Sequence, residues 1–195
     1  DVYKRQPGHH ASHDQFGGYC FINNAAVAAQ HLRDRGLRKV AVLDVDFHHG
    51  NGTQAIFYNR SDVLFLSLHG DPMHAFPHFL GHADEIGNGE GEGFNFNYPM
   101  PAGTSFAEWN SSLVSAIDQI AKFGADAVVI SLGVDTFERD PISFFKLTSP
   151  DFIKVGASIA SMNLPTLFVM EGGYAVEEIG INTVNVLMGF KEKET

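Results

Sequence analysis

The sequence predicts an α/β fold, with a parallel sheet flanked by helices, and three observations support this prediction. Short apolar runs rich in β-branched residues alternate along the chain with longer segments of helical periodicity. The apolar runs are continuous, which is typical of strands buried on both faces of a sheet. The chain has 195 residues, 44% of them hydrophobic, which is enough for one substantial core in one domain.

Each predicted element has its own pattern. Good helix formers with apolar residues three and four positions apart predict helices at 22–35, 105–123 and 149–161. The apolar runs predict strands at 39–46, 62–68, 125–132 and 165–170. A Gly-rich acidic segment, DEIGNGEGEGFN at 84–95, predicts a loop.

Charge and composition narrow the function classes. The formal net charge is −10, whereas a nucleic-acid-binding protein carries a basic patch or stripe. The single cysteine, Cys20, rules out an intrachain disulfide and is typical of a reducing compartment. No apolar run in the sequence reaches the roughly 18–20 residues that span a bilayer. We therefore expect a soluble, cytoplasmic protein that binds neither nucleic acid nor membrane.

Polar residues follow three of the predicted strands where each strand ends. Asp44, Asp46 and His48 stand at alternate positions, so their side chains share one side of the chain. Asp135 comes shortly after the third predicted strand, and Tyr174 shortly after the fourth. Because ligand sites form at the carboxyl ends of parallel strands, we expect these groups to converge.

Asp46, His48 and Asp135 form a candidate metal site. Two carboxylates and one imidazole suit zinc, and three protein ligands leave one coordination position open for water and substrate. Such an ion polarises a carbonyl group and activates water. The alternative is a carboxylate cluster that caps a helix or stabilises a loop, and the spacing alone favours neither.

A second histidine pair, His9 and His10, stands in a Pro/Gly turn with no carboxylate beside it. Imidazole suits a general base or acid, because its pKa lies near working pH. Tyr174 follows two glycines and has a hydroxyl that could stabilise an oxyanion. The alternatives are a loop histidine pair with satisfied hydrogen bonds and an ordinary exposed tyrosine.

Several motifs in order carry a resemblance to a known family. They are PGHHA, GGYCFINNAAVAA, VLDVDFHHGNGTQAIFY, SLHGDP, SLGVDTFERDP and MEGGY. With them the chain resembles the zinc-dependent histone deacetylase superfamily, and within it most of all the bacterial acetylpolyamine amidohydrolases. The resemblance runs from Pro7 to about Phe190 and implies an arginase/deacetylase-like fold.

The resemblance implies a role for each matching residue. It implies that Asp46, His48 and Asp135 bind one catalytic zinc ion. It implies that His10 is the general base and that Tyr174 stabilises the oxyanion. His49 is then the non-ligand member of its pair.

Further residues match the surroundings of this centre. His9 matches the histidine that tunes His10, while Asp44 and Asn51 match the groups that hold His9 and His10. The residues that match a narrow substrate tunnel are Gly18, Tyr19 and Phe76. Two structural sites for potassium or sodium are also implied, an inner one at Asp44, Asp46, His48, Ser67 and Leu68, and an outer one at Phe57, Arg60, Val63 and Phe94.

The resemblance also bears on domain organisation. Family members carry a long further segment before the first histidine pair. We therefore expect residues 7–195 to be the C-terminal portion of a single deacetylase catalytic domain that lacks its N-terminal part. Residues 1–6 are expected to be an unrelated or artefactual leader. We expect poor solubility and little turnover from this chain alone, and a homodimer of the intact protein stays open.

The implied reaction is removal of acetyl groups from small cationic acetylated polyamines, giving acetate and a free amine. The segment 76–101 looks more like the polyamine enzymes than the eukaryotic histone deacetylases. The acidic residues of the Gly-rich loop would attract polycations if they lie at the tunnel mouth, namely Asp84, Glu85, Glu90 and Glu92. The alternative is a solvated loop far from the site.

Other functions also stay open at this point. One is an acetyl-lysine protein deacetylase of the histone deacetylase type. Another is a non-catalytic relative that binds acetylated ligands. A binuclear manganese ureohydrolase shares the broader fold type, but it needs more carboxylates than stand at 44–51.

Overall fold

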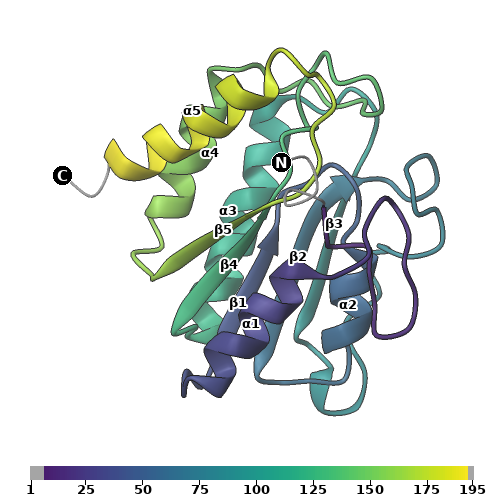
Figure 1. The fold of residues 1–195 in the computed structure, drawn as a ribbon, viewed down its shortest axis with the longest axis vertical. Coiled ribbons are helices and arrows are strands. Elements are labelled where there is room, and N and C mark those ends of the chain that lie inside the picture. Colours follow the sequence, from purple (N-terminus) through teal and green to yellow (C-terminus); the bar gives the residue numbers. More distant parts are fainter. Residues whose placement is uncertain (1–6, 193–195) are drawn as a thin grey trace.

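A parallel β-sheet with helices on both faces organises the chain in the computed structural model, which describes residues 7–192 (Figure 1). The strand order is β3-β2-β1-β4-β5, and every neighbouring pair is parallel. The strands are β1 Val40–Asp44, β2 Val63–Gly70, β3 Asn95–Met100, β4 Ala127–Leu132 and β5 Thr166–Met170. This arrangement confirms the predicted α/β fold. The predicted leader at 1–6 lies outside the described residues.

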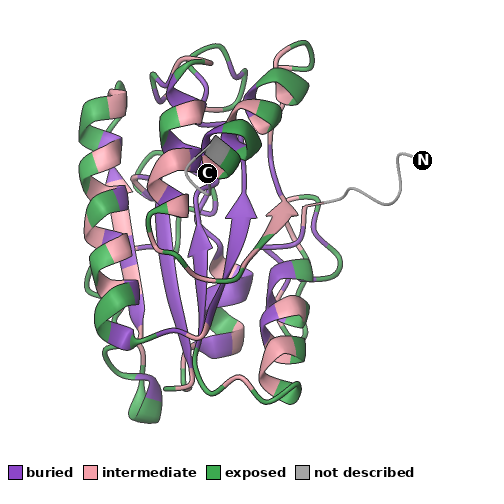
Figure 2. Cartoon of the chain, turned by 90° about the vertical axis from the view of Figure 1, so that its left-hand side faces the viewer, coloured by how far each residue is buried: buried purple, intermediate pink, exposed green. Residues whose placement is uncertain are grey.

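The two faces of the sheet are covered by different helices. Helices α1 Asn24–Asp34 and α2 Asn51–Phe57 pack on one face, and α3 Phe106–Phe123 and α4 Asp151–Ala160 cover the other. Helix α5 Ile179–Glu192 packs against α4. Strands β1, β2 and β4 are buried along their whole length, which explains their continuous apolar runs (Figure 2).

The helix ends follow from local sequence. Ser105 caps α3 by accepting the Glu108 amide, while the Glu108 carboxylate accepts the Ser105 amide. Gly124 ends the same helix with a left-handed φ of 70°. Within residues 7–192, no helix is both long enough and apolar enough to cross a membrane.

Three elements were not predicted from the sequence. Helix α2 begins at an Asn-Gly pair, which usually marks a turn. Strand β3 contains Pro99 and two asparagines, and it is stable as an edge strand where a proline is tolerated. Helix α5 contains two glycines and several β-branched residues, so its stability comes from packing on α4. The loop predicted at 84–95 contains a 3₁₀ turn, η2 Gly89–Gly91, and Asn95 already begins β3.

The strand order reverses its direction at β1. From β1 the chain moves outward to β2 and β3, and then crosses back to β4 on the other side of β1. Asp44 at the end of β1 pairs in register with Ser131 of β4. The loops that follow β1 and β4 therefore separate at a topological switch point, where ligands bind in open α/β sheets.

Candidate metal and catalytic site

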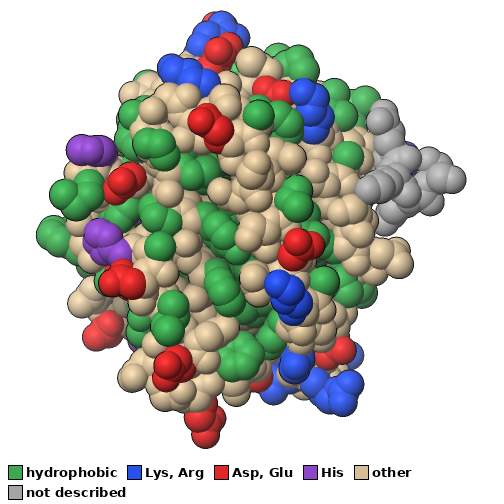
Figure 3. All heavy atoms as spheres, turned by 180° about the vertical axis from the view of Figure 1, so that it is seen from behind, with side chains coloured by type: hydrophobic (Ala, Val, Ile, Leu, Met, Phe, Trp, Pro, Cys, Tyr) green, Lys and Arg blue, Asp and Glu red, His purple; other side chains and the backbone are tan. Residues whose placement is uncertain are grey.

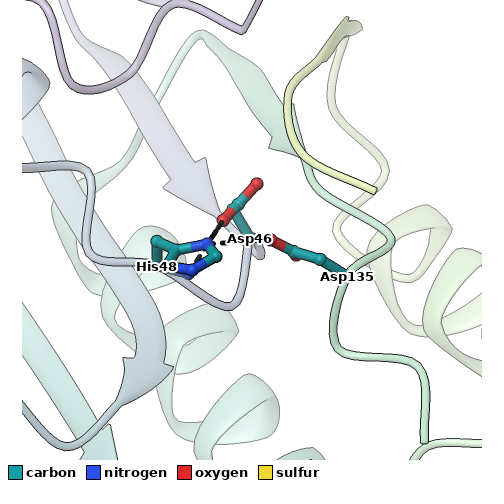
Figure 4. Close-up of side chains that lie close together, drawn as sticks. All are labelled: Asp46, His48 and Asp135. Carbon is teal, nitrogen blue, oxygen red and sulfur yellow. Dashed lines mark hydrogen bonds and ion pairs between the residues drawn. The ribbon is translucent and has the colours of Figure 1, made fainter. Parts of the chain in front are cut away.

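Asp46, His48 and Asp135 meet at this switch point (Figure 4). Strand β1 ends at Asp44, two residues before Asp46, but the alternation of side chains continues through the following loop. His48 Nδ1 lies 3.2 Å from Asp46 Oδ1 and 2.9 Å from Asp135 Oδ2. All three side chains are buried, and one ligand atom from each lies within 4.8 Å of the others. The predicted convergence is therefore present.

Backbone amides fix the two carboxylates. Gly172 donates to Asp46 Oδ2 at 2.7 Å, and Phe47 donates to Asp135 Oδ1 at 2.8 Å. The close approach requires glycine, because a Cβ at Gly172 would lie 2.6 Å from Asp135 Oδ2 and 2.7 Å from Asp46 Oδ2. The segment that follows β5 therefore contacts the carboxylates that follow β1 and β4.

The electrostatics of this cluster fit a divalent cation. Burial and the neighbouring charge of Asp46 raise the pKa of Asp135 to about 7. Burial lowers the pKa of His48, but its contacts with Asp135 and Asp46 outweigh this and raise it to about 10. Two buried carboxylates and one imidazole that share a single point are a donor set that zinc accepts. The three residues therefore fit a zinc site of the kind that the sequence predicts.

The first histidine pair lies beside the metal cluster, and each ring has its own partner. His9 Nδ1 lies 2.8 Å from Asp44 Oδ2, and His10 Nδ1 lies 2.6 Å from Asn51 Oδ1. The two rings are 4.0 Å apart between centroids. The pairing predicted for Asp44 and Asn51 is thus the one that the structure has.

The two histidines have opposite electrostatic environments. Burial disfavours the charged ring of His9, but Asp44, Asp46 and Glu171 hold its pKa well above its ordinary value. Burial and the charge of His9 together lower the pKa of His10 to about 3. His9 is therefore the protonated member of the pair and His10 the neutral one.

A cavity of about 450 Å³ opens above these residues. Its lining includes six residues of the predicted catalytic, metal and substrate sites, namely His10, Gly18, Tyr19, His48, Phe76 and Tyr174. Phe76 packs edge-on against His10 with ring centroids 4.9 Å apart. The ring centroids of Tyr19 and Tyr174 are 6.3 Å apart. Burial and the charge of Asp46 raise the pKa of Tyr174, so its hydroxyl keeps its proton.

Gly18 brings the chain against the His10 ring. Its φ is +51°, and a Cβ at this position would lie 2.1 Å from Cδ2 of His10. Gly17 next to it has no atom within 4 Å of an added Cβ. Glycine is therefore required at Gly18, where the cavity wall meets the ring.

His49 points away from the metal cluster. Its Nε2 lies 3.0 Å from Gln54 Oε1, and its ring lies 4.6 Å from that of His69. Burial lowers the pKa of both His49 and His69, the latter to about 4. The alternation of side chains after β1 accounts for this split between His48 and His49.

The acidic residues of the Gly-rich loop do not line the cavity, so of the two placements left open by the sequence the structure favours the one away from the site. Glu85 points inward, and its Oε2 accepts hydrogen bonds from the Gln54 side chain at 2.6 Å and from the Gly81 amide at 2.9 Å. Glu90 lies in η2, which packs on Tyr58 at the end of the sheet opposite to the cavity. None of the four predicted acidic residues lines the cavity, as far as the described chain goes. On the face of the molecule seen from behind the view of Figure 1, acidic side chains stand among hydrophobic and basic ones (Figure 3).

The residues of the two implied monovalent-cation sites lie as follows. In the inner set, Asp44 and Ser67 are register partners in β1 and β2. In the outer set, the carbonyl of Phe57 accepts the Arg60 amide at 2.9 Å, and the carbonyl of Phe94 accepts the Phe65 amide at 3.0 Å. Both cation sites stay predictions.

Several residues at the site were missed by the sequence analysis. Glu171 accepts hydrogen bonds from the first histidine loop, and Asp140 accepts them from the Tyr174 loop. Glu171 follows β5 directly, so the rule that identified Asp135 could have found it. The additional cavity-lining residues are Phe47, His74, Ala75, Ile142 and Phe144, and no sequence signal marks them.

The fold and this geometry match proteins that are already known. A family model described as "Histone deacetylase domain" matches residues 2–189. The acetylpolyamine amidohydrolase of Mycoplana ramosa is 65% identical over 95% of the chain, and acetylpolyamine amidohydrolase 2 of Pseudomonas aeruginosa is 64% identical over 96%. The crystal structure of acetylpolyamine aminohydrolase from Burkholderia pseudomallei superposes with a TM-score of 0.92, at 47% identity over 94% of the chain.

These matches establish the family while leaving part of each relative uncovered. The chain spans 54% of the length of each of these three proteins. The family model, in contrast, covers nearly the whole chain. The chain therefore belongs to the histone deacetylase domain family, as its motifs predict.

Proposed function

We propose that the protein is a zinc-dependent amidohydrolase that removes acetyl groups from acetylated polyamines, giving acetate and a free amine. The observation that carries the proposal is the convergence of the Asp46–His48–Asp135 cluster, His10 and Tyr174 at one cavity. Two relatives that are 65% and 64% identical are named acetylpolyamine amidohydrolases, which supports this substrate class over other acetylated compounds.

In this proposal Asp46, His48 and Asp135 hold the zinc ion. When bound, zinc supplies a Lewis acid that polarises a carbonyl oxygen and activates water. The amides of Gly172 and Phe47 keep the two carboxylates in place for this role.

His10 acts as the general base. With Asn51 Oδ1 accepting from His10 Nδ1, the other ring nitrogen is left free to take a proton. The charge of His9 keeps His10 neutral, and Asp44 keeps His9 charged and oriented. Tyr174 keeps its hydroxyl proton and donates a hydrogen bond to the oxyanion that develops on the acetyl carbonyl.

The cavity walls favour a slender aliphatic substrate with a cationic end. The aromatic side chains of Tyr19 and Phe76 line the cavity, and both are exposed to solvent. Aromatic rings pack against methylene groups and attract ammonium groups. A polyamine offers both groups.

Three further assignments belong to the same proposal. Potassium or sodium occupies the two implied monovalent-cation sites. Residues 7–195 form part of a single deacetylase catalytic domain, which the 54% coverage of the relatives supports. The cytoplasm is the compartment, because a lone cysteine is typical of a reducing environment.

The experiment compares substrates in the zinc-loaded intact protein, because little turnover is expected from residues 1–195 alone. The value of kcat/KM is measured for acetylputrescine, acetylspermidine and an acetyl-lysine peptide, at low and at high ionic strength. We expect both acetylpolyamines to exceed the peptide at both salt concentrations. A peptide that exceeds them at both would overturn the polyamine assignment and leave a protein deacetylase.

Two controls separate the remaining alternatives. The variant Glu90→Gln with Glu92→Gln should keep the salt dependence of the unmodified protein, because η2 lies at the opposite end of the sheet. Binding of acetylputrescine without turnover would identify a non-catalytic relative. Two metal ions per chain would favour a binuclear ureohydrolase.

A further inference from the structure

The carboxylate of Asp140 connects two loops that line the cavity. Its Oδ2 accepts hydrogen bonds from the backbone amides of Tyr174 at 2.7 Å and Ala175 at 3.3 Å. Its Oδ1 accepts the backbone amide of Ile142 at 3.1 Å. Asp140 is only 6% exposed, and both Ile142 and Tyr174 line the cavity.

The Tyr174 loop has few other backbone contacts at this point. Backbone hydrogen bonds tie Glu171 to Leu132 and Gly172 to Val134, which fixes the chain up to Gly172. Helix α5 begins at Ile179, and the carbonyl of Ala175 accepts the backbone amides of Glu178 and Ile179. Between Gly172 and this turn, Asp140 is the group that accepts from the Tyr174 and Ala175 amides, so the backbone at Tyr174 depends on its side chain.

We propose that Asp140 is a positioning residue that sets where the Tyr174 hydroxyl lies in the cavity. The inference rests on the proposed function, in which this hydroxyl meets the developing oxyanion. A donor placed on such a loop needs a fixed backbone, because a displacement of about 1 Å can cost about 10²-fold in rate. The hydrogen bond to Ile142 also fixes part of the cavity wall.

The hydrogen bonds of the Asp140 carboxylate can be tested by one substitution that keeps the size of the side chain. Both oxygens of Asp140 accept from backbone amides, and on each side only an acceptor fits. In Asp140→Asn one oxygen becomes an amide nitrogen, which is a donor and faces another donor. The variant keeps the volume of the side chain but breaks one of the two ties.

The first test is a double-mutant cycle on kcat with acetylputrescine in the zinc-loaded intact protein. Tyr174→Phe should lower kcat by about 10²–10³-fold, the usual cost of a lost oxyanion donor. Asp140→Asn should lower kcat about 10-fold or more and change KM less than twofold. In the Tyr174→Phe background it should have almost no further effect, because the hydroxyl is already gone. Effects that multiply would overturn the proposal, since a purely structural role is indifferent to that hydroxyl.

Asp151→Asn serves as the matched control. Asp151 is also a buried carboxylate that accepts a backbone amide, that of Thr148, but it stands at the start of α4 and not at the cavity. This variant should keep kcat. An equal loss of kcat in both variants would assign the effect of Asp140→Asn to general destabilisation.

A second readout is independent of turnover. Hydrogen exchange of the Tyr174 and Ala175 amides should be slow in the unmodified protein and at least tenfold faster in Asp140→Asn, with zinc content unchanged. Fast exchange in the unmodified protein would overturn the inference even if Asp140→Asn failed to fold. Slow, Asp140-dependent exchange in a protein without deacetylase activity would contradict the proposed function. It would still support the role of Asp140 in positioning the Tyr174 loop.

Discussion

The side chain of Glu171 holds the backbone of His9. Its Oε2 accepts the His9 amide at 3.1 Å and also the Gly8 amide at 2.5 Å. The first histidine loop has no helix or strand of its own, so this contact ties it to the end of β5. The other carboxylate oxygen, Oε1, is buried and has no hydrogen-bond partner within residues 7–192.

This environment predicts a stability that depends on pH. Burial raises the pKa of Glu171 to about 7 from its ordinary value of 4.5. Between these values the folded protein holds a proton that the unfolded chain has released. Stability from this group is therefore complete below pH 4.5 and is lost as the pH rises through 7, by about 3 kcal/mol at most.

Glu171→Gln removes this titration while keeping an acceptor for the two amides. In the metal-free protein, the variant should gain stability relative to the unmodified protein between pH 5 and pH 8. Urea unfolding followed by the fluorescence of Trp109, the single tryptophan, measures this difference. The exposed neighbour Glu177→Gln should show no such trend. A difference that stays constant with pH would contradict the prediction.

The metal cluster predicts a loss of zinc in two variants. Asp46→Asn and His48→Ala each remove one of three ligands, so both should abolish zinc binding and activity together. Elemental analysis of the purified protein gives the zinc content per chain. His31→Ala is the control, because His31 is exposed on α1 and should leave one zinc per chain. Full zinc content in both ligand variants would show that the ligands are other residues.

The adjacent glycines Gly17 and Gly18 provide a matched pair at the cavity wall. Gly18→Ala places a Cβ 2.1 Å from the His10 ring at a positive φ, so the ring or the loop must move. We expect kcat/KM to fall by at least about tenfold, on the scale of a misplaced catalytic group. Gly17→Ala meets no atom within 4 Å and should stay within twofold. Equal effects of the two substitutions would show that the close approach of Gly18 to the His10 ring does not matter for activity.

The sequence predicted the elements whose local pattern and tertiary environment agree. Strands β1, β2 and β4 are apolar throughout because both of their faces are covered. The metal cluster was predictable because side chains alternate after β1 and because parallel strands end at one edge. The motifs of the family then assigned His9 and His10, whose environment no local rule gives.

The rest depends on contacts between distant segments. Asp140 and Tyr174 are 34 residues apart, and Glu171 and Gly8 are 163 apart, so spacing along the chain carries no trace of either contact. The position of the acidic loop stayed open because its charge was visible in the sequence, whereas the inward orientation of Glu85 was not. Its partners, Gln54 and Asn97, come from α2 and β3, the elements that local propensity did not predict.

Helix α5 predicts self-association of the 195-residue chain. Its exposed face carries an apolar stripe at helical spacing, formed by Ile181, Val184, Leu187 and Met188. Next to this helix, β5 forms one edge of the sheet, and its Leu167 is 45% exposed (Figure 1). Contiguous apolar surface and an unpaired strand edge both promote association between chains.

We therefore expect the mass measured by light scattering to rise with protein concentration. Val184→Lys combined with Leu187→Glu should shift the chain towards monomers, because the two charges interrupt the middle of the stripe. Val176→Lys is the control, since Val176 is 82% exposed but precedes the helix, and it should leave the association unchanged. A chain that stays monomeric at all concentrations would show that the apolar stripe does not drive association in solution. A defined dimer abolished by the paired charges would instead identify α5 as a symmetric interface between two copies.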